Sequence, residues 1–321
     1  EHTRGHLLQE HPARLPGGGR EPRGGRTRAL TTGPGRKGDV PIEPTAIAAL
    51  ARGFSCPQET RLDGLVESVA SAYARETTAR FLRQHGAGLR SHLPGWHDGL
   101  ADWVSREPSF EAAWAPVFGT LGALVTGASP VTTVEAAVRL GLWLVETGQP
   151  MSWSGILPAP IQLRFQDRIL DGVSAVDVRS TGSALRLAAE TTRGSREDWF
   201  FRMPDGRWHS TVPPTCPVVS CAGHPVTLLF AEAIRTADAS YLWHEAVGLE
   251  EAPSALRTWG EAIRLMARFA PHYLEWVDRL LRYLIPLKAE SADAIRSGSN
   301  VYEPGLIHVS TRCVPAALAE M

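Results

Sequence analysis

The chain has 321 residues, of which 43% are hydrophobic and 21% charged, and its 33 basic residues nearly balance its 34 acidic ones, for a formal charge of −1. Such a balance gives no overall field that would attract nucleic acid or an anionic membrane surface. No apolar run approaches the roughly 18–20 residues needed to span a bilayer. We therefore expect an ordinary globular protein with no nucleic-acid partner and no membrane partner.

The first 40 residues are rich in glycine and arginine and contain almost no aliphatic side chains. A segment that can bury so little apolar surface does not offset its ordering entropy, so residues 1–40 are predicted to be a disordered basic tail. The alternative is a basic arm for anionic partners. The segment lacks the apolar centre of a signal peptide, and four scattered cysteines are typical of reduced thiols, so a cytoplasmic location is expected.

Residues 41–150 are predicted to form an N-terminal helical region. Apolar residues recur every three or four positions over Leu62–Phe81, in a helix expected to end at Gly86. Two further helices are predicted over Phe110–Val125 and Val131–Glu146. No Gly-Lys-Ser/Thr follows any glycine cluster, so the glycines between these helices do not indicate a phosphate-binding loop.

The periodicity changes to that of β-strands over residues 151–230, which are predicted to form a β-rich insertion. The hairpin signal is clearest at Trp199–His209, where the turn residues Met203-Pro-Asp-Gly206 separate aromatic side chains. The other expected strands are Ile161–Leu170, Ala175–Val178, Ala184–Ala188, Pro217–Cys221 and Val226–Phe230. A small, mostly antiparallel sheet is therefore expected between two groups of helices.

Helical spacing resumes after residue 230, so residues 231–321 are predicted to be a C-terminal helical region. The expected helices are Ala231–Val247, one capped by Ser254 that runs to about Phe269, and Tyr273–Leu284. The predicted fold class is α+β, mainly helical, with a small antiparallel β insertion in the middle of the chain.

The final stretch begins where that last helix is expected to stop, near Pro286. A Ser/Gly/Asn loop at Ser297–Asn300 precedes a short strand at Leu306–Ser310, and Pro315 then opens a new helix. After about one and a half turns that helix stops, with its last carbonyls lacking partners. The chain as given is therefore expected to be truncated.

Within this stretch, SGSNVYEPGLIHVS followed by a Pro-Ala-Ala-Leu-Ala-Glu helix start resembles a segment of the HExxH motif-containing peptide-modification proteins. These bacterial maturases of ribosomally made peptides include some that are similar to iron(II)/2-oxoglutarate-dependent β-hydroxylases. In the family, the helix begun here continues into Leu-Val-His-Glu-x-x-His, whose two histidines lie on one helical face and share a metal ion.

The resemblance implies a precursor peptide as partner and Fe(II) and 2-oxoglutarate as cofactors of the intact protein. The motif itself would follow Met321, so no catalytic or metal-ligating residue is assigned within this chain, which is expected to be inactive as given. Substrate-binding residues, in contrast, are predicted within this chain, on the strand Leu306–Ser310. In HExxH proteins a strand beside the metal helix often forms the wall on which extended substrate lies.

By that analogy, the alternate side chains His308 and Ser310 are predicted to face the substrate. A free edge of the same strand would also accept a peptide by β-augmentation. The alternative is a plain core strand with a solvent-facing histidine.

Two other groups of metal-ligand residue types have plainer interpretations. His244-Glu245-Ala-Val-Gly248 has glycine where the second histidine of the motif would stand, so a polar pair on a surface helix is the simpler expectation. The ligand types of a tetrahedral zinc site occur within sixteen residues, at His209, Cys216, Cys221 and His224. Their spacing matches no common zinc motif, so buried thiols and partly exposed imidazoles are the simpler expectation.

Three functions remain open at this point. The first is the peptide hydroxylase that the resemblance implies. The second is a zinc metallopeptidase, in which the glutamate of the missing motif would be general base to a metal-bound water. The third is a non-catalytic helical protein that binds a partner through an exposed groove.

Overall fold

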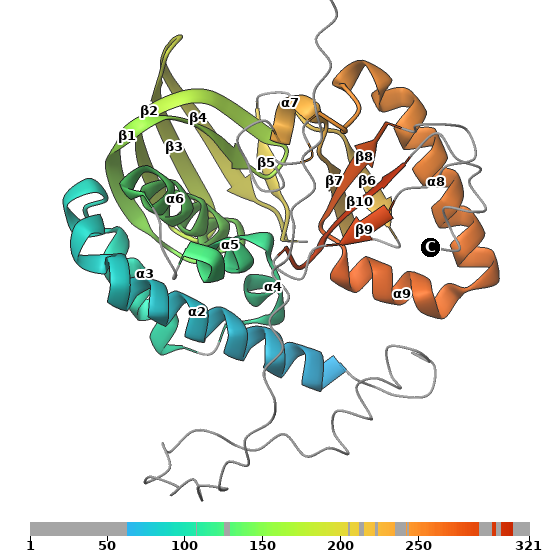
Figure 1. Cartoon of the computed structure of the whole chain (residues 1–321), viewed down its shortest axis with the longest axis horizontal. Coiled ribbons are helices and arrows are strands. Elements are labelled where there is room, and N and C mark those ends of the chain that lie inside the picture. The colour runs from blue at the N-terminus through green and yellow to red at the C-terminus, as the bar shows by residue number, and fades with distance from the viewer. Residues whose placement is uncertain are drawn as a thin grey trace, which may run out of the picture. The chain divides into compact units, whose positions relative to one another are not determined.

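The computed structural model describes residues 63–106, 108–124, 129–204, 206–211, 215–221, 224–234, 242, 244–288, 297–299 and 303–310. All of them belong to one compact unit, Ile47–Met321 (Figure 1). None of the described helices is both long enough and apolar enough to cross a membrane. The predicted tail at residues 1–40 and the helix expected from Pro315 lie outside the described residues.

The first described elements are helices, as the apolar spacing predicts, but the helix expected to end at Gly86 continues to His92. They are α2 (Asp63–His92), α3 (Trp96–Ser105), α4 (Phe110–Ala113), α5 (Pro116–Leu124) and α6 (Pro130–Glu146). The single helix predicted over Phe110–Val125 is wrong, because Pro116 lacks an N–H and disfavours helical geometry in the residue before it. The helix predicted over Val131–Glu146 is confirmed, and the Ser129 hydroxyl caps it by accepting from the N–H of Thr132.

Five antiparallel strands follow and form sheet A in the order β1-β2-β3-β4-β5. They are β1 (Ser152–Phe165), β2 (Arg168–Ser180), β3 (Ala184–Thr191), β4 (Gly194–Arg202) and β5 (Trp208–Ser210). One face of the sheet packs on the helices, α6 against β1 most of all, in a core that includes Trp96, Phe118 and Phe165 (Figure 1). The predicted hairpin is confirmed, since Arg202 of β4 pairs with Trp208 of β5 across the expected turn.

A second five-stranded sheet, sheet B, has the order β6-β7-β8-β10-β9. Its strands are β6 (Val218–Cys221), β7 (His224–Leu228), β8 (Tyr283–Leu287), β9 (Ser297–Ser299) and β10 (Leu306–Ser310). β8 runs parallel to both β7 and β10, whereas β6 and β9 are antiparallel to their neighbours. One face is covered by α8 (Ala252–Phe269) and α9 (Pro271–Leu280), which share a core with it.

The expected mixed α+β class is therefore confirmed, but strands are not confined to the middle of the chain. The helix predicted over Tyr273–Leu284 ends at Leu280, and residues 283–287 form β8 instead. All five residues of β8 are buried. A short, continuous apolar run suits a fully buried strand as well as a helix, so periodicity alone does not distinguish the two.

Two other helix predictions need correction. Of the predicted helix Ala231–Val247, the structure describes only one helical turn, α7 (Ala231–Ile234), and Ala246 forms a bridge with Leu287 of β8. Ser254 does not cap the next helix. A short 3-10 turn, η2 (Leu249–Glu251), leads directly into α8, which places Ser254 inside the helix.

Candidate functional site

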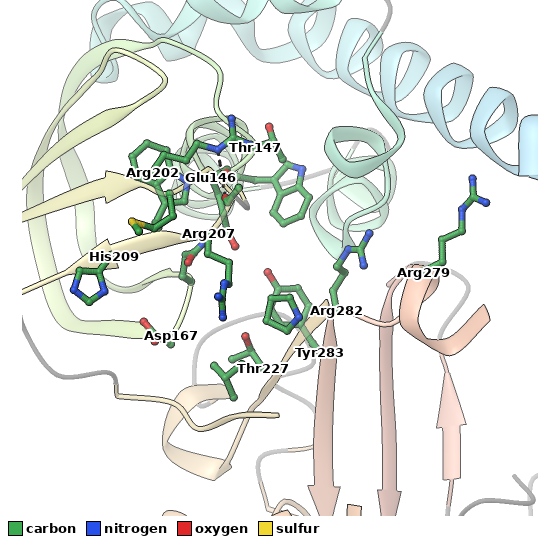
Figure 2. Close-up of a pocket in the computed structure, with 17 residues that line it drawn as sticks. Glu146, Thr147, Asp167, Arg202, Arg207, His209, Thr227, Arg279, Arg282 and Tyr283 are labelled. Atoms are coloured by element: carbon green, nitrogen blue, oxygen red, sulfur yellow. Dashed lines mark hydrogen bonds between the residues drawn. The ribbon is translucent and has the colours of Figure 1, made fainter. Parts of the chain in front are cut away.

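A cavity of about 1020 Å³ lies where the two sheets approach each other (Figure 2). Its walls come from the end of α6, the β1–β2 turn, the β4–β5 hairpin, strands β6 and β7, and the junction of α9 with β8. In Figure 2, Glu146 and Arg207 point into this space, with His209 on the side of β5 and Arg282 and Tyr283 on the side of β8.

Positive charge predominates among the described residues of the lining. Four arginines line the cavity, Arg202 and Arg207 from the hairpin and Arg279 and Arg282 from the α9–β8 junction, against two carboxyl groups. One arginine is partly neutralised from outside the cavity, because Arg279 forms an ion pair with Glu67 of α2. The excess of arginines over carboxyl groups in the lining still favours an anionic ligand, since guanidinium groups bind carboxylates and phosphates through charge-assisted hydrogen bonds.

The end of α6 positions both Glu146 and Arg202. The helix stops because Gly148 takes a left-handed conformation (φ 90°), and its N–H bonds to the carbonyl of Val145 at 2.9 Å. The guanidinium of Arg202 lies directly over Gly148, in the space that a Cβ atom would occupy. The left-handed backbone favours glycine at this position, and the absence of a side chain lets Arg202 approach closely.

Glu146 is the last residue of α6, and its carboxyl group is strongly perturbed. Burial raises its pKa from 4.5 to about 7, although the charge of Arg164 and hydrogen bonds from the backbone and side chain of Gln166 oppose the shift. The nearby charge of Asp167 adds to the rise. A carboxyl with a pKa near neutrality in a cavity is typical of functional sites, where such a group can exchange a proton at physiological pH.

The β1–β2 turn that faces Glu146 is held under strain. Gln166 is the only described residue other than glycine with a positive φ, 52°, a conformation that costs roughly 1–2 kcal/mol for most side chains. Two sets of contacts hold the turn. Gln166 bonds to Glu146 on one side, and on the other the carbonyl of Asp167 accepts the N–H groups of Thr215 and Cys216, both at 2.8 Å.

Three aromatic residues of the cavity lining, Trp143, Trp208 and Tyr283, are held in place by specific contacts. The indole N–H of Trp143 donates to the carbonyl of Ala112, and that of Trp208 to the carbonyl of Glu146, both at 2.8 Å. The guanidinium of Arg164 sits 4.3 Å from the centre of the Tyr283 ring, in cation–π geometry. Because these rings are anchored in several elements, the cavity has a defined shape.

A second, smaller cavity of about 40 Å³ adjoins the first behind Trp143, Glu146 and Tyr283. Arg139, Gln162 and Arg164 contribute its polar lining. A space of this volume with several polar groups is large enough for a water molecule. Glu146 thus separates the main cavity from a small polar compartment inside the protein.

The two residues predicted to face substrate do not line the main cavity. His308 and Ser310 lie on β10, where Ser310 is completely buried and His308 is half-buried against Gly298. The edge of this strand, expected to be available for peptide addition, is not free, because β8 pairs on one side of it and β9 on the other. The prediction of an edge strand is wrong because β9 lies in a segment that the sequence pattern assigned to a loop.

The residues considered for zinc are dispersed. His209 lines the cavity, but Cys216 and Cys221 are buried in different core clusters of sheet B. Burial raises the pKa of both thiols to about 11. Within the described part of the chain, no three His, Cys, Asp or Glu residues are grouped so that they could hold a metal ion. The side chain of His224 lies outside the described residues.

Sequence reasoning missed the arginines and Glu146. The one available signal was the pair Arg202 and Arg207, which flank the turn of the predicted hairpin. Their convergence with Arg279 and Arg282 depends on how the two sheets pack.

No protein-family model, no curated protein and no solved structure matches the chain. The chemistry of the cavity and the resemblance of the last residues are therefore the two indications of function.

Proposed function

We propose that the arginine-lined cavity binds an acidic segment of a peptide. The observation that carries the proposal is the lining of one space by Arg202, Arg207, Arg279 and Arg282, against two carboxyl groups among the described lining residues. Of these two, Glu146 has a pKa of about 7 and is therefore about half protonated at neutral pH. A ligand with several carboxylates complements this arrangement.

The size and the walls of the cavity favour a peptide over a small anion. A volume of about 1020 Å³ lies at the upper end of the roughly 300–1,000 Å³ typical of small-molecule sites. The half-buried Trp143 offers apolar surface to the side chains between the charged ones. The precursor peptide implied by the resemblance at the end of the chain is the natural candidate for this ligand.

Binding of short synthetic peptides tests the proposal. We expect a glutamate-rich peptide to bind and its glutamine counterpart to bind at least tenfold more weakly. Arg207→Gln and Arg282→Gln should each weaken binding of the glutamate peptide by about tenfold, because each removes a charged hydrogen-bond donor worth roughly 1.5–3 kcal/mol.

Arg193→Gln is the matched control. Arg193 is exposed in the β3–β4 turn, at the far end of β4 from Arg202, roughly 25 Å away along the strand. This variant loses the same charge but should bind normally. If all three variants weaken binding equally, the effect is one of net charge, and the proposal fails.

A second candidate is the iron(II)/2-oxoglutarate-dependent hydroxylation of a precursor peptide. It is supported by the terminal resemblance alone. The described residues do not fit the metal, since they bring together no set of three ligands. None of them is therefore assigned a catalytic step.

Because the chain as given is expected to be inactive, the test uses a chain that carries the HExxH helix implied by the resemblance. Incubation of that chain with the peptide, Fe(II) and 2-oxoglutarate separates the candidates that remain. A product that carries one additional oxygen atom in its mass spectrum supports the hydroxylase. In a parallel incubation, zinc replaces Fe(II) and 2-oxoglutarate. Cleavage of the peptide there supports the zinc metallopeptidase. A bound but unchanged peptide supports a partner-binding protein.

A further inference from the structure

The cavity runs beside the edge of a strand. Trp208 and His209 are consecutive in β5, so their side chains point to opposite faces of sheet A. Trp208 is buried in the core and His209 is exposed, yet both line the cavity. Val218 and Thr227 of sheet B line the opposite side, so the cavity lies between β5 and sheet B and borders the outer edge of β5.

That edge carries backbone groups directed away from the sheet. β5 is the last strand of sheet A among the described strands, and its other side pairs with β4. The N–H of Met203 donates to the carbonyl of Arg207, so the backbone groups of Arg207 point toward β4. Because these directions alternate along a strand, the N–H and C=O of Trp208 point the opposite way, toward the cavity side.

We propose that the acidic peptide binds as an extended strand added to sheet A along the outer edge of β5. This inference rests on the proposed function, which supplies the ligand, and it adds the way in which the ligand is recognised. Main-chain hydrogen bonds to an exposed edge give affinity in such complexes, and alternate side chains give specificity.

The two faces of β5 predict which peptide fits. Arg207, directly before the strand, is two positions from His209 and shares its face, whereas Trp208 lies on the other face. Side chains of an added strand alternate in the same way. A peptide in which acidic and apolar residues alternate therefore places its carboxylates beside Arg207 and His209 and its apolar side chains on the opposite face, the one to which Trp208 belongs.

Backbone N-methylation of the peptide tests this arrangement without changing the protein. The probe is a short peptide in which glutamate alternates with valine. One isomer carries an N-methyl group on every glutamate, and the other on every valine. Because the N–H groups of alternate residues point to the same edge of an extended peptide, each isomer lacks hydrogen-bond donors along one edge. We expect one isomer to bind at least tenfold more weakly than the unmodified peptide, and the other to bind like it.

Equal binding of the two isomers would overturn strand addition, even if Arg207→Gln still weakened binding as the proposed function requires. Failure of the unmodified peptide to bind would instead overturn the proposed function. Hydrogen exchange locates the contact, and we expect the amide of Trp208 to become protected. Protection of β6, the other sheet edge near the cavity, in place of β5 would overturn the inference. So would displacement of the peptide by a single-stranded RNA of equal charge.

Discussion

At the scale of single residues, Glu146 stands out because two local preferences oppose its charge. A carboxylate at the C-terminal end of a helix meets the negative end of the helix dipole, and burial removes it from water. The bonds from Gln166 and the charge of Arg164 offset only part of this cost. A residue whose local environment disfavours its charged form, and which lines a cavity, is typical of a functional site.

This perturbation predicts an unusual dependence of stability on pH. The folded protein holds a proton on Glu146 up to about pH 7, whereas the unfolded chain releases it near pH 4.5. The folded state thus binds more protons between these values. The free energy of unfolding should therefore fall as pH rises through the window, by at most about 3 kcal/mol, with the full loss present above pH 7.

Glu146→Gln should remove this contribution. Urea unfolding at about pH 5 and about pH 8 is the measurement, and the variant should lose less stability between them than the wild-type protein. Glu261→Gln, on the exposed face of α8, is the control and should behave like the wild type. A variant with an unchanged pH profile would show that Glu146 is not protonated as described.

At the scale of elements, sheet A curls so that strands that are not neighbours in the sheet meet. Arg168 begins β2 and Asp198 lies on β4, with β3 between them in strand order, yet their charged groups approach to 3.7 Å. Both side chains are almost completely buried, at 4% and 3% exposure. Arg196 also bonds to Asp198, at 3.1 Å. This buried ion pair holds the β1–β2 hairpin, and hence the strained Gln166 turn, over the rest of the sheet.

Asp198→Asn should destabilise the protein strongly. The substitution leaves the charge of Arg168 buried without its carboxylate, which typically costs about 3–5 kcal/mol. Asp177→Asn, on β2, is the matched control, because its pair with Arg186 is only partly buried and should contribute less than about 1 kcal/mol. Chemical unfolding of both variants gives the comparison, and similar losses would argue against the role assigned to the buried pair.

At the scale of the whole described unit, one contact between the two sides of the cavity is made by Trp114. The indole of Trp114, between α4 and α5, donates to the carbonyl of Leu280 at the end of α9, at 2.7 Å. Gly305, before β10, takes a left-handed conformation (φ 82°) beside the same indole. The position of Arg279 and Arg282 relative to the β4–β5 hairpin depends on contacts such as this hydrogen bond.

Trp114→Phe should loosen this connection. It removes a hydrogen bond worth about 1 kcal/mol and leaves the Leu280 carbonyl without that donor. We expect faster hydrogen exchange in α9 and weaker binding of the acidic peptide. Trp199→Phe is the control, because that indole is 46% exposed and donates to Glu197 on the surface of sheet A. If the two variants behave alike, Trp114 does not connect the two sides.

The sequence by itself determined what depends on local pattern. Apolar spacing and the Ser129-Pro130 cap locate α6, and turn residues between aromatic side chains locate the β4–β5 hairpin. The mixed α+β class follows from such segments. The tail and the terminal resemblance also come from the sequence. Both remain predictions, because the tail lies outside the described residues and no family model matches the chain.

Tertiary structure alone decided the rest. Residues 283–287 became a strand because β7 and β10 pair with them and both faces are covered, which no periodicity records. The same packing left β10 without a free edge and β5 at the end of its sheet. The cavity forms where segments distant in the sequence pack together. Arg202 and Arg282, for example, both line it and are eighty positions apart. The raised pKa of Glu146 likewise results from burial and from neighbouring charges, which only folding supplies.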